Sequence, residues 1–230
     1  MFKQSLCLAA LLTLPLLANA ATVTLYGDDV KFSYDDSSLF GSATVVGNNI
    51  FFLPTAFRAE SFNGQSPSPT LDTLNIVAEV TTAGYVMTGF SLLEQGDYRL
   101  STGGTSVGVN TNIQVSSGSA LCGPSNTACQ ANHNVNASGL SAIGSTTEWS
   151  ASSNINLADT LGWGSDTLAT VQVQNTLNAS TLNVGEQAWV QKKFIGVAVQ
   201  TSEVPVPAAF WLFGSALASL SYLRRIQSNR

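Results

Sequence analysis

The stretch Leu74-Asn75-Ile76-Val77-Ala78-Glu79-Val80 carries its apolar side chains on alternate positions. Leu74, Ile76, Ala78 and Val80 therefore share one face of an extended chain, because successive side chains of a strand point to opposite sides. A period of two, rather than the 3.6 of a helix, predicts a half-buried β-strand.

The same alternation recurs from residue 21 to residue 203, and no window there has the pattern of an amphipathic helix. Many short strands separated by turns predict an all-β fold, an antiparallel β-sandwich with a jelly-roll-like strand order. A solenoid is the alternative, but the sequence has no fixed-period repeat to support it. The other predicted strands are 23–26, 30–34, 43–46, 50–53, 84–93, 98–101, 113–115, 171–174 and 189–199.

Turn residues punctuate these strands. Asn48-Asn49, which follows a glycine, and Gly96-Asp97 are both predicted to lie in turns. From about residue 101 to residue 165, Ser, Thr, Asn and Gly dominate the composition. Such a composition fits solvent-facing strands, long loops or partial disorder, and the sequence leaves all three open.

Residues 1–20 have the three parts of a secretory signal peptide. Lys3 supplies the positive charge, residues 5–17 are apolar, and Ala18-Asn19-Ala20 is a small-x-small cleavage site. We therefore expect the mature chain to begin at Ala21 and to leave the cytoplasm.

The C-terminal end predicts one membrane-spanning helix. Residues 208–223 form an apolar run that reaches about 24 Å as a helix, somewhat less than the roughly 30 Å hydrocarbon core. Arg224 and Arg225 follow this run and should stay in the cytoplasm by the positive-inside rule. Everything before the span then lies outside, which agrees with the signal peptide.

The tail from residue 204 to residue 230 carries an ordered motif. Val204-Pro205-Val206-Pro207-Ala208 comes first, Trp211-Leu212-Phe213-Gly214-Ser215 lies in the apolar run, and the two arginines follow. This tail resembles the PEP-CTERM sorting signals of exopolysaccharide-producing Gram-negative bacteria, in the variant written VPxPA. Here Val206 stands where the usual signal has Glu, and residues 226–230 extend past the arginines.

The resemblance to PEP-CTERM signals implies how the chain is exported and sorted, and it implies nothing about its activity. It implies transient anchoring in the inner membrane, cleavage near the prolines by an exosortase, which is a membrane protease, and delivery to the cell surface or the medium. A plain C-terminal membrane anchor is the alternative.

The segment between the two signals, residues 21–203, has a length that suits one domain with a single core. It holds fourteen acidic and five basic residues, so its formal charge is −9. An acidic surface argues against nucleic acid and anionic lipid as partners, because both require a basic footprint.

Cys122 and Cys129 enclose a turn-rich loop, whereas Cys7 leaves with the signal peptide. In a chain bound for an oxidising compartment, this pair predicts a local disulfide. A metal site formed by Cys122, Cys129 and His133 is the alternative, although it lacks a fourth ligand and the spacing of a zinc knuckle.

Residues 21–203 contain candidates for two kinds of ligand site. The carboxylates of four aspartates offer hard oxygen ligands for Ca²⁺, with solvated turns as the alternative. Trp163, which lies among loop residues, and then Trp149 are the candidates for an exposed platform on which a sugar stacks. A place in the core is the alternative for Trp163, and we expect it for Trp189. The candidate calcium ligands are Asp28, Asp29, Asp35 and Asp36.

No catalytic constellation is predicted, so we expect no enzyme. The stretch 104–108 matches the G-x-S-x-G pattern around Ser106, but no helix follows and no acid lies between Ser106 and the sole histidine, His133. A glycosidase needs two carboxylates at a defined distance in space. Sequence spacing does not give that distance, so no catalytic pair is predicted.

Three hypotheses for the exported part follow. The first is a non-enzymatic surface or extracellular-matrix protein associated with exopolysaccharide, an association that the tail implies. The alternative is a carbohydrate-binding module, and a secreted polysaccharide hydrolase is the third.

Overall fold

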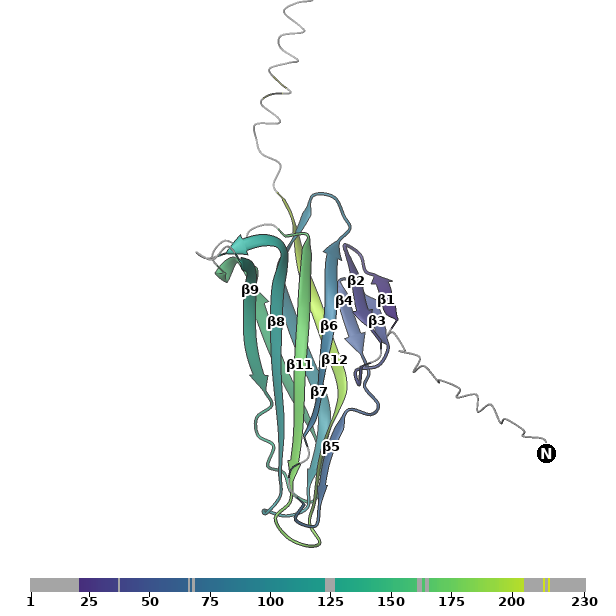
Figure 1. Ribbon diagram of the computed structural model, residues 1–230, viewed down its shortest axis with the longest axis vertical. Coiled ribbons are helices and arrows are strands. Elements are labelled where there is room, and N and C mark those ends of the chain that lie inside the picture. The colour runs from purple at the N-terminus through teal and green to yellow at the C-terminus, as the bar shows by residue number, and fades with distance from the viewer. Residues whose placement is uncertain are drawn as a thin grey trace, which may run out of the picture.

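The chain folds as a β-sandwich of two antiparallel sheets packed face to face (Figure 1). The computed structural model describes residues 21–36, 38–65, 67, 69–122, 127–160, 163, 166–204, 213 and 215. The prediction of an all-β antiparallel fold is confirmed, while the jelly-roll-like strand order stays a prediction.

Each sheet has six strands, and consecutive strands of the chain are often not neighbours. Sheet A has the spatial order β1 (Thr22–Tyr26), β2 (Val30–Asp35), β6 (Thr70–Val80), β11 (Leu168–Ser180), β8 (Ser106–Cys122) and β9 (Thr127–Asn136). Sheet B has the order β10 (Thr146–Asn156), β7 (Tyr85–Leu100), β12 (Gln187–Glu203), β4 (Asn49–Phe52) and β3 (Ala43–Val46), and β5 (Arg58–Phe62) also pairs with β12. A single turn of 3₁₀-helix, η1 (Leu157–Asp159), follows β10.

The core lies between the sheets and is built by the alternation seen in the sequence. Ile76 on β6, Val171 on β11, Phe90 on β7 and Val197 on β12 are all fully buried in it. Burial of one such side chain contributes about 1.5–3 kcal/mol, so the alternating positions of the long strands supply most of the driving force.

Aromatic rings fill the part of the core beside β4. Phe52 packs edge-to-face against Tyr34, with ring centroids 5.1 Å apart, and Phe40 packs in the same way against Phe57 at 5.2 Å. Phe40 also contacts Phe52, at 6.5 Å, so the rings form one continuous cluster. Edge-to-face pairs of this kind add about 0.5–1.5 kcal/mol beyond the area that they bury.

The predicted turn at Gly96-Asp97 is wrong, because both residues lie inside β7, which runs unbroken from Tyr85 to Leu100. Gly96 is needed there for close approach. A Cβ atom on it would lie 2.8 Å from the ring of Trp149 and 2.0 Å from the carbonyl oxygen of Gln191. Glycine inside a strand often marks such a contact rather than a turn.

Most of the described part of the polar stretch from residue 101 to residue 165 forms strands, and residues 101–105 and 137–145 connect them. β8, β9 and β10 all lie in it. On β8, Val109, Ile113 and Val115 face the core together with Thr111, while Asn110 and Asn112 face outward, so this strand follows the same period of two. β5 was not among the predicted strands, because its five residues include both Arg58 and Glu60.

Candidate functional site

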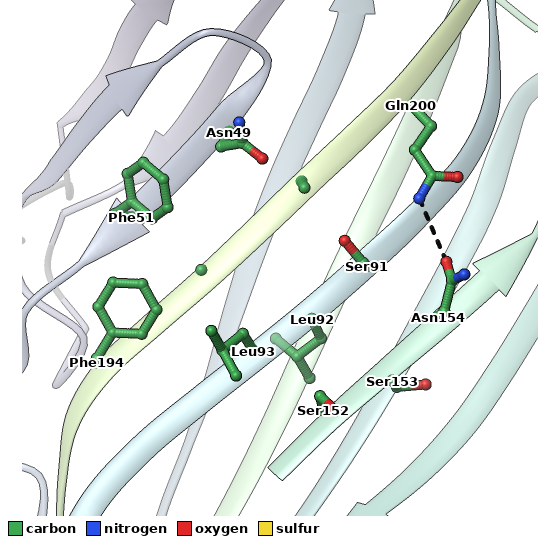
Figure 2. A pocket seen from close by; sticks show the side chains of 12 residues that line it. Asn49, Phe51, Ser91, Leu92, Leu93, Ser152, Ser153, Asn154, Phe194 and Gln200 are labelled. Carbon is green, nitrogen blue, oxygen red and sulfur yellow. Dashed lines mark hydrogen bonds between the residues drawn. The ribbon is translucent and has the colours of Figure 1, made fainter. Parts of the chain in front are cut away.

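The outer face of sheet B is hollowed where β10, β7, β12 and β4 lie side by side (Figure 2). Ile195 and Val197 of β12 point into the core, so Phe194, Gly196 and Ala198 point away from it and line the hollow. The hollow has a volume of about 660 Å³, in the range of small-molecule sites.

One side of the hollow is aromatic. The rings of Phe51 on β4 and Phe194 on β12 lie with centroids 5.7 Å apart and planes inclined by 36°. Gly196, paired with Phe51 across the strands, keeps the floor low, because a Cβ atom there would lie 3.1 Å from both rings. Both rings are half-buried, which leaves apolar surface facing the hollow.

The other side of the hollow carries amides and hydroxyls. Gln200 of β12 donates a hydrogen bond from Nε2 to Oδ1 of Asn154 on β10, at 3.4 Å. Ser91 and Ser152 add hydroxyl groups from the two neighbouring strands, and Asn49 adds an amide from β4. Amides and hydroxyls both donate and accept hydrogen bonds, so this side can pair with a ligand rich in hydroxyl groups.

The twelve residues that line the hollow are all uncharged. A hollow with aromatic rings on one side and neutral hydrogen-bonding groups on the other has no charge with which to select an ion. It suits a neutral, polar ligand with an apolar face, a description that fits the faces of a sugar ring.

Neither Trp149 nor Trp163 is an exposed platform in this structure. Both indole groups are about 5% exposed and belong to the core. Nε1 of Trp149 donates a hydrogen bond to the carbonyl oxygen of Gln191 at 3.2 Å, which ties the ring to the interior. The alternative of a core position therefore holds for Trp163, and it holds for Trp149 and Trp189 as well.

The four candidate calcium ligands do not come together. Asp28 and Asp29 precede β2, whereas Asp35 and Asp36 end it, so the two pairs are separated by about 17–20 Å of strand. Hydrogen bonds from Asn48 above all hold the pKa of Asp29 below its usual value. In the described part of the chain, no three His, Cys, Asp or Glu side chains gather where they could hold a metal ion.

Cys122 at the end of β8 and Cys129 on β9 form the predicted disulfide, with Cα atoms 4.9 Å apart. His133 lies further along β9 and makes a hydrogen bond through Nδ1 with Oγ of Ser153 on β10, at 2.9 Å. The cysteines and the histidine therefore have separate structural roles, one within sheet A and the other between the edges of the two sheets.

Sequence reasoning missed Phe51 and Phe194 as site residues. Phe51 lies between Ile50 and Phe52, which are both buried, so strand alternation points Phe51 to the outer face. This alternation could have identified Phe51 as a surface aromatic residue. For Phe194 the alternation fails, because β12 has a bulge between Lys192 and Phe194. The extra residue turns the phenyl ring outward.

Most of the predicted sorting signal lies outside the described residues. Val204 is described, and its N–H donates to the carbonyl oxygen of Gly84 at 2.7 Å, next to the end of β12. The signal peptide of residues 1–20 and Pro205, Pro207, Ala208, Arg224 and Arg225 fall outside that part. Among the residues that the structure describes, no helix is long and apolar enough to cross a membrane.

Comparison with known proteins gives no family. No family model matches the chain, and no curated protein matches its sequence. Two solved structures of virus capsids are similar over part of their length: the T13 particle of IBDV and the Gt strain of infectious bursal disease virus. Sequence identity is 10% in both, over 80% and 74% of this chain, with TM-scores of 0.20 and 0.17. The chain spans about half the length of these neighbours, 48% and 49%, and TM-scores this low carry no argument about its fold or function.

Proposed function

We propose that the chain is a non-enzymatic surface or extracellular-matrix protein, exported through its signal peptide and sorted by an exosortase. The ordered tail carries this proposal: the VPxPA motif, the apolar run and Arg224-Arg225 follow one another from residue 204 onward. The association with exopolysaccharide is part of the same proposal and comes from the resemblance of the tail.

Two features of the sandwich support export. β12 ends at Glu203, so the sandwich is complete before the motif begins at Val204, and cleavage near the prolines would release an intact fold. The disulfide between Cys122 and Cys129 suits an oxidising compartment, where such bonds form and persist.

Fractionation of cells with and without an exosortase tests the route. We expect the chain at the surface or in the medium, without its tail, when the exosortase is present, and in the inner membrane with its tail when the exosortase is absent. The double substitution Pro205→Ala and Pro207→Ala should reproduce the second pattern. A chain that stays in the inner membrane with its tail even when the exosortase is present would show that the tail is a plain anchor.

A carbohydrate-binding module is the second candidate, and the uncharged hollow on sheet B favours it. Phe51 and Phe194 offer a surface for the apolar face of a sugar ring, while Asn154 and Gln200 offer hydrogen bonds to its hydroxyl groups. The hollow lies on strands rather than on loops, and sites on such rigid elements hold their geometry well.

Binding to a glycan array and to extracted exopolysaccharide tests the hollow. We expect Phe194→Ala to weaken binding at least about tenfold, a loss of about 1.4 kcal/mol, because the stacking surface is removed. Tyr26→Ala is the matched control, since Tyr26 is 72% exposed on the edge strand of the other sheet and should leave binding unchanged. The addition of Ca²⁺ should have no effect on this site. Equal loss in both variants, or no binding near about 1 mM ligand, would overturn the assignment.

A further inference from the structure

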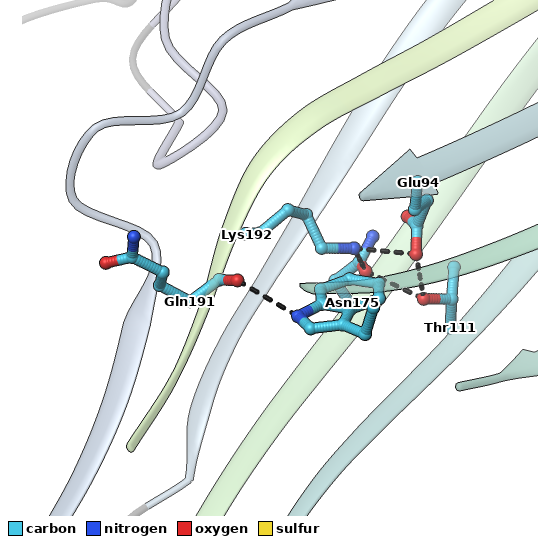
Figure 3. Close-up of polar contacts among 6 residues, drawn as sticks. Glu94, Thr111, Asn175, Gln191 and Lys192 are labelled. Atoms are coloured by element: carbon cyan, nitrogen blue, oxygen red, sulfur yellow. Dashed lines mark hydrogen bonds and ion pairs between the residues drawn. The ribbon is translucent and has the colours of Figure 1, made fainter. Parts of the chain in front are cut away.

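A group of polar side chains lies buried in the centre of the sandwich, away from the hollow (Figure 3). Lys192 of β12 and Glu94 of β7 come from sheet B, and Asn175 of β11 and Thr111 of β8 come from sheet A. All four are at most 3% exposed. A lysine and a glutamate are almost never buried this completely unless they are paired.

A bulge in β12 directly follows Lys192, which keeps the inward phase of Ala188 and Val190. Lys192 pairs with Gly96 and Phe194 pairs with Gln95, so Lys193 is the extra residue between them. Lys193 points outward to the carboxylate of Asp97, while Lys192 enters the core. Its Nζ atom lies 5.6 Å from the ring centroid of Trp149 and 5.8 Å from that of Phe57, so aromatic rings cover it.

Lys192 Nζ contacts two groups at once. It lies 2.7 Å from Oε2 of Glu94, and it contacts Oδ1 of Asn175, the carbonyl oxygen of the side-chain amide. Oγ1 of Thr111 lies 2.6 Å from the same Glu94 oxygen and 2.8 Å from Asn175 Oδ1. A hydroxyl has one hydrogen, so Thr111 donates to one of these two oxygens at a time.

Attack on an amide needs Lys192 as a neutral amine, and its surroundings ease the loss of its proton. Burial lowers the pKa of Lys192 to about 8, against the opposing effect of Glu94. Transfer of the proton from the ammonium to Glu94 also removes two charges from a dry interior, where each is costly. A neutral amine has a free electron pair and is a nucleophile.

Two polar atoms of the group have no hydrogen-bond partner among the described residues: Oε1 of Glu94 and Nδ2 of Asn175. Buried atoms without partners are rare in folded proteins and call for an explanation. Here nothing holds the amide nitrogen of Asn175 in place, and a free carboxyl oxygen of Glu94 is available beside the reacting groups to relay a proton.

We propose that Lys192 and Asn175 join in an intramolecular isopeptide bond, with Glu94 as the proton relay. The electron pair of Lys192 Nζ attacks Cγ of Asn175 and forms a new C–N bond. Glu94 delivers a proton to Nδ2, the bond from Cγ to Nδ2 breaks, and ammonia leaves. Nζ loses its second proton to the carboxylate, which restores Glu94. No oxidant, metal or other reactant is consumed.

The bond would tie sheet A to sheet B through β11 and β12, at positions 17 residues apart in the sequence. Such a link keeps the two layers of the sandwich joined even when the hydrogen-bonded ladders are pulled or frayed. This inference goes beyond the proposed function and does not depend on the route of export.

Mass spectrometry of the purified full chain tests the bond. A protease that cuts after Glu, applied to the denatured and reduced protein, cuts after Glu148, Glu186 and Glu203 and separates residues 149–186 from 187–203. We expect the two segments to remain joined as one branched product, about 17 Da lighter than their sum, the mass of one ammonia. Two separate segments of unmodified mass would overturn the proposal.

The same digest of three variants tests the role of each residue. Lys193→Met, which removes the outward-facing neighbour, should keep the branched product, and Lys192→Met should abolish it. Glu94→Gln keeps the shape but removes the proton relay, and it should leave the segments separate in a protein that still has the circular dichroism of a β-sandwich. A complete cross-link in Glu94→Gln would overturn the role of Glu94. Loss of about 17 Da from 149–186 alone would indicate that Asn175 reacts without Lys192, and would overturn the bond.

Discussion

Replacement of Lys192 by Met should lower the free energy of unfolding by about 3–5 kcal/mol, one of the two largest losses that we expect from a single substitution. Lys192 and Glu94 are both buried completely and lie 2.7 Å apart, so the variant removes the proposed cross-link and leaves the carboxyl group of Glu94 buried without its partner. Chemical denaturation followed by tryptophan fluorescence measures this loss, because Trp149 lies over the pair.

Two further variants separate the causes of that loss. Lys193→Met should cost less than Lys192→Met, because Lys193 is about half exposed, although the carboxylate of Asp97 that it contacts is largely buried. The double variant Glu94→Leu and Lys192→Met should recover the part due to the unpaired carboxylate. It should not recover the roughly 3 kcal/mol that a cross-link closing a loop of this length contributes. An equal cost for Lys192→Met and Lys193→Met would contradict the burial of the pair.

Phe52→Ala should also cost about 3–5 kcal/mol, because the ring is fully buried and packs against both Tyr34 and Phe40. Truncation leaves a cavity that the surrounding rings cannot fill without losing their edge-to-face contacts. The thermal or chemical unfolding midpoint, measured by circular dichroism, reports the loss.

Phe51→Ala is the matched control for Phe52, since the two residues are neighbours on β4 and point to opposite faces. It should cost no more than about 1 kcal/mol, because the half-buried ring of Phe51 lines the hollow rather than the core. A loss of stability as large as that of Phe52→Ala would contradict the outward direction of the Phe51 side chain.

The short strands follow closely from the sequence, because their alternation is local. The predicted segments 23–26, 30–34 and 43–46 correspond to β1, β2 and β3 with shifts of at most one residue at either end. The long strands were harder. Gly96 breaks the apolar pattern of β7 for a reason that lies on another strand, the ring of Trp149, and no local pattern contains that contact.

The candidate sites were less predictable than the fold, because they depend on how strands from distant parts of the chain meet. The formal charge of −9 counts Lys192 and Glu94 as ordinary charges, although the fold buries both and pairs them. The outward direction of Phe194 depends on a bulge, and the sequence Lys192-Lys193 gives no sign of which lysine is the extra residue. The hollow likewise needs Phe51 and Phe194, which are far apart in the chain, to lie side by side.

The bulge at Lys193 in β12 lies between the buried group and the hollow. Lys192, just before it, keeps the inward phase of Val190, and the bulge then sends Phe194 to the outer face. Bulges often re-aim side chains next to functional sites. A deletion of Lys193 would therefore disturb both places at once, whereas Lys193→Met keeps the register of the strand.

The central proposal is that this sandwich is exported and freed from its two terminal signals. Identification of the terminal peptides of the protein recovered from the surface or medium of producing cells tests it most directly. We expect an N-terminus at Ala21 and a C-terminus close to Pro205–Pro207. A recovered chain that still begins at Met1, or that still ends at Arg230, would contradict removal of the corresponding signal.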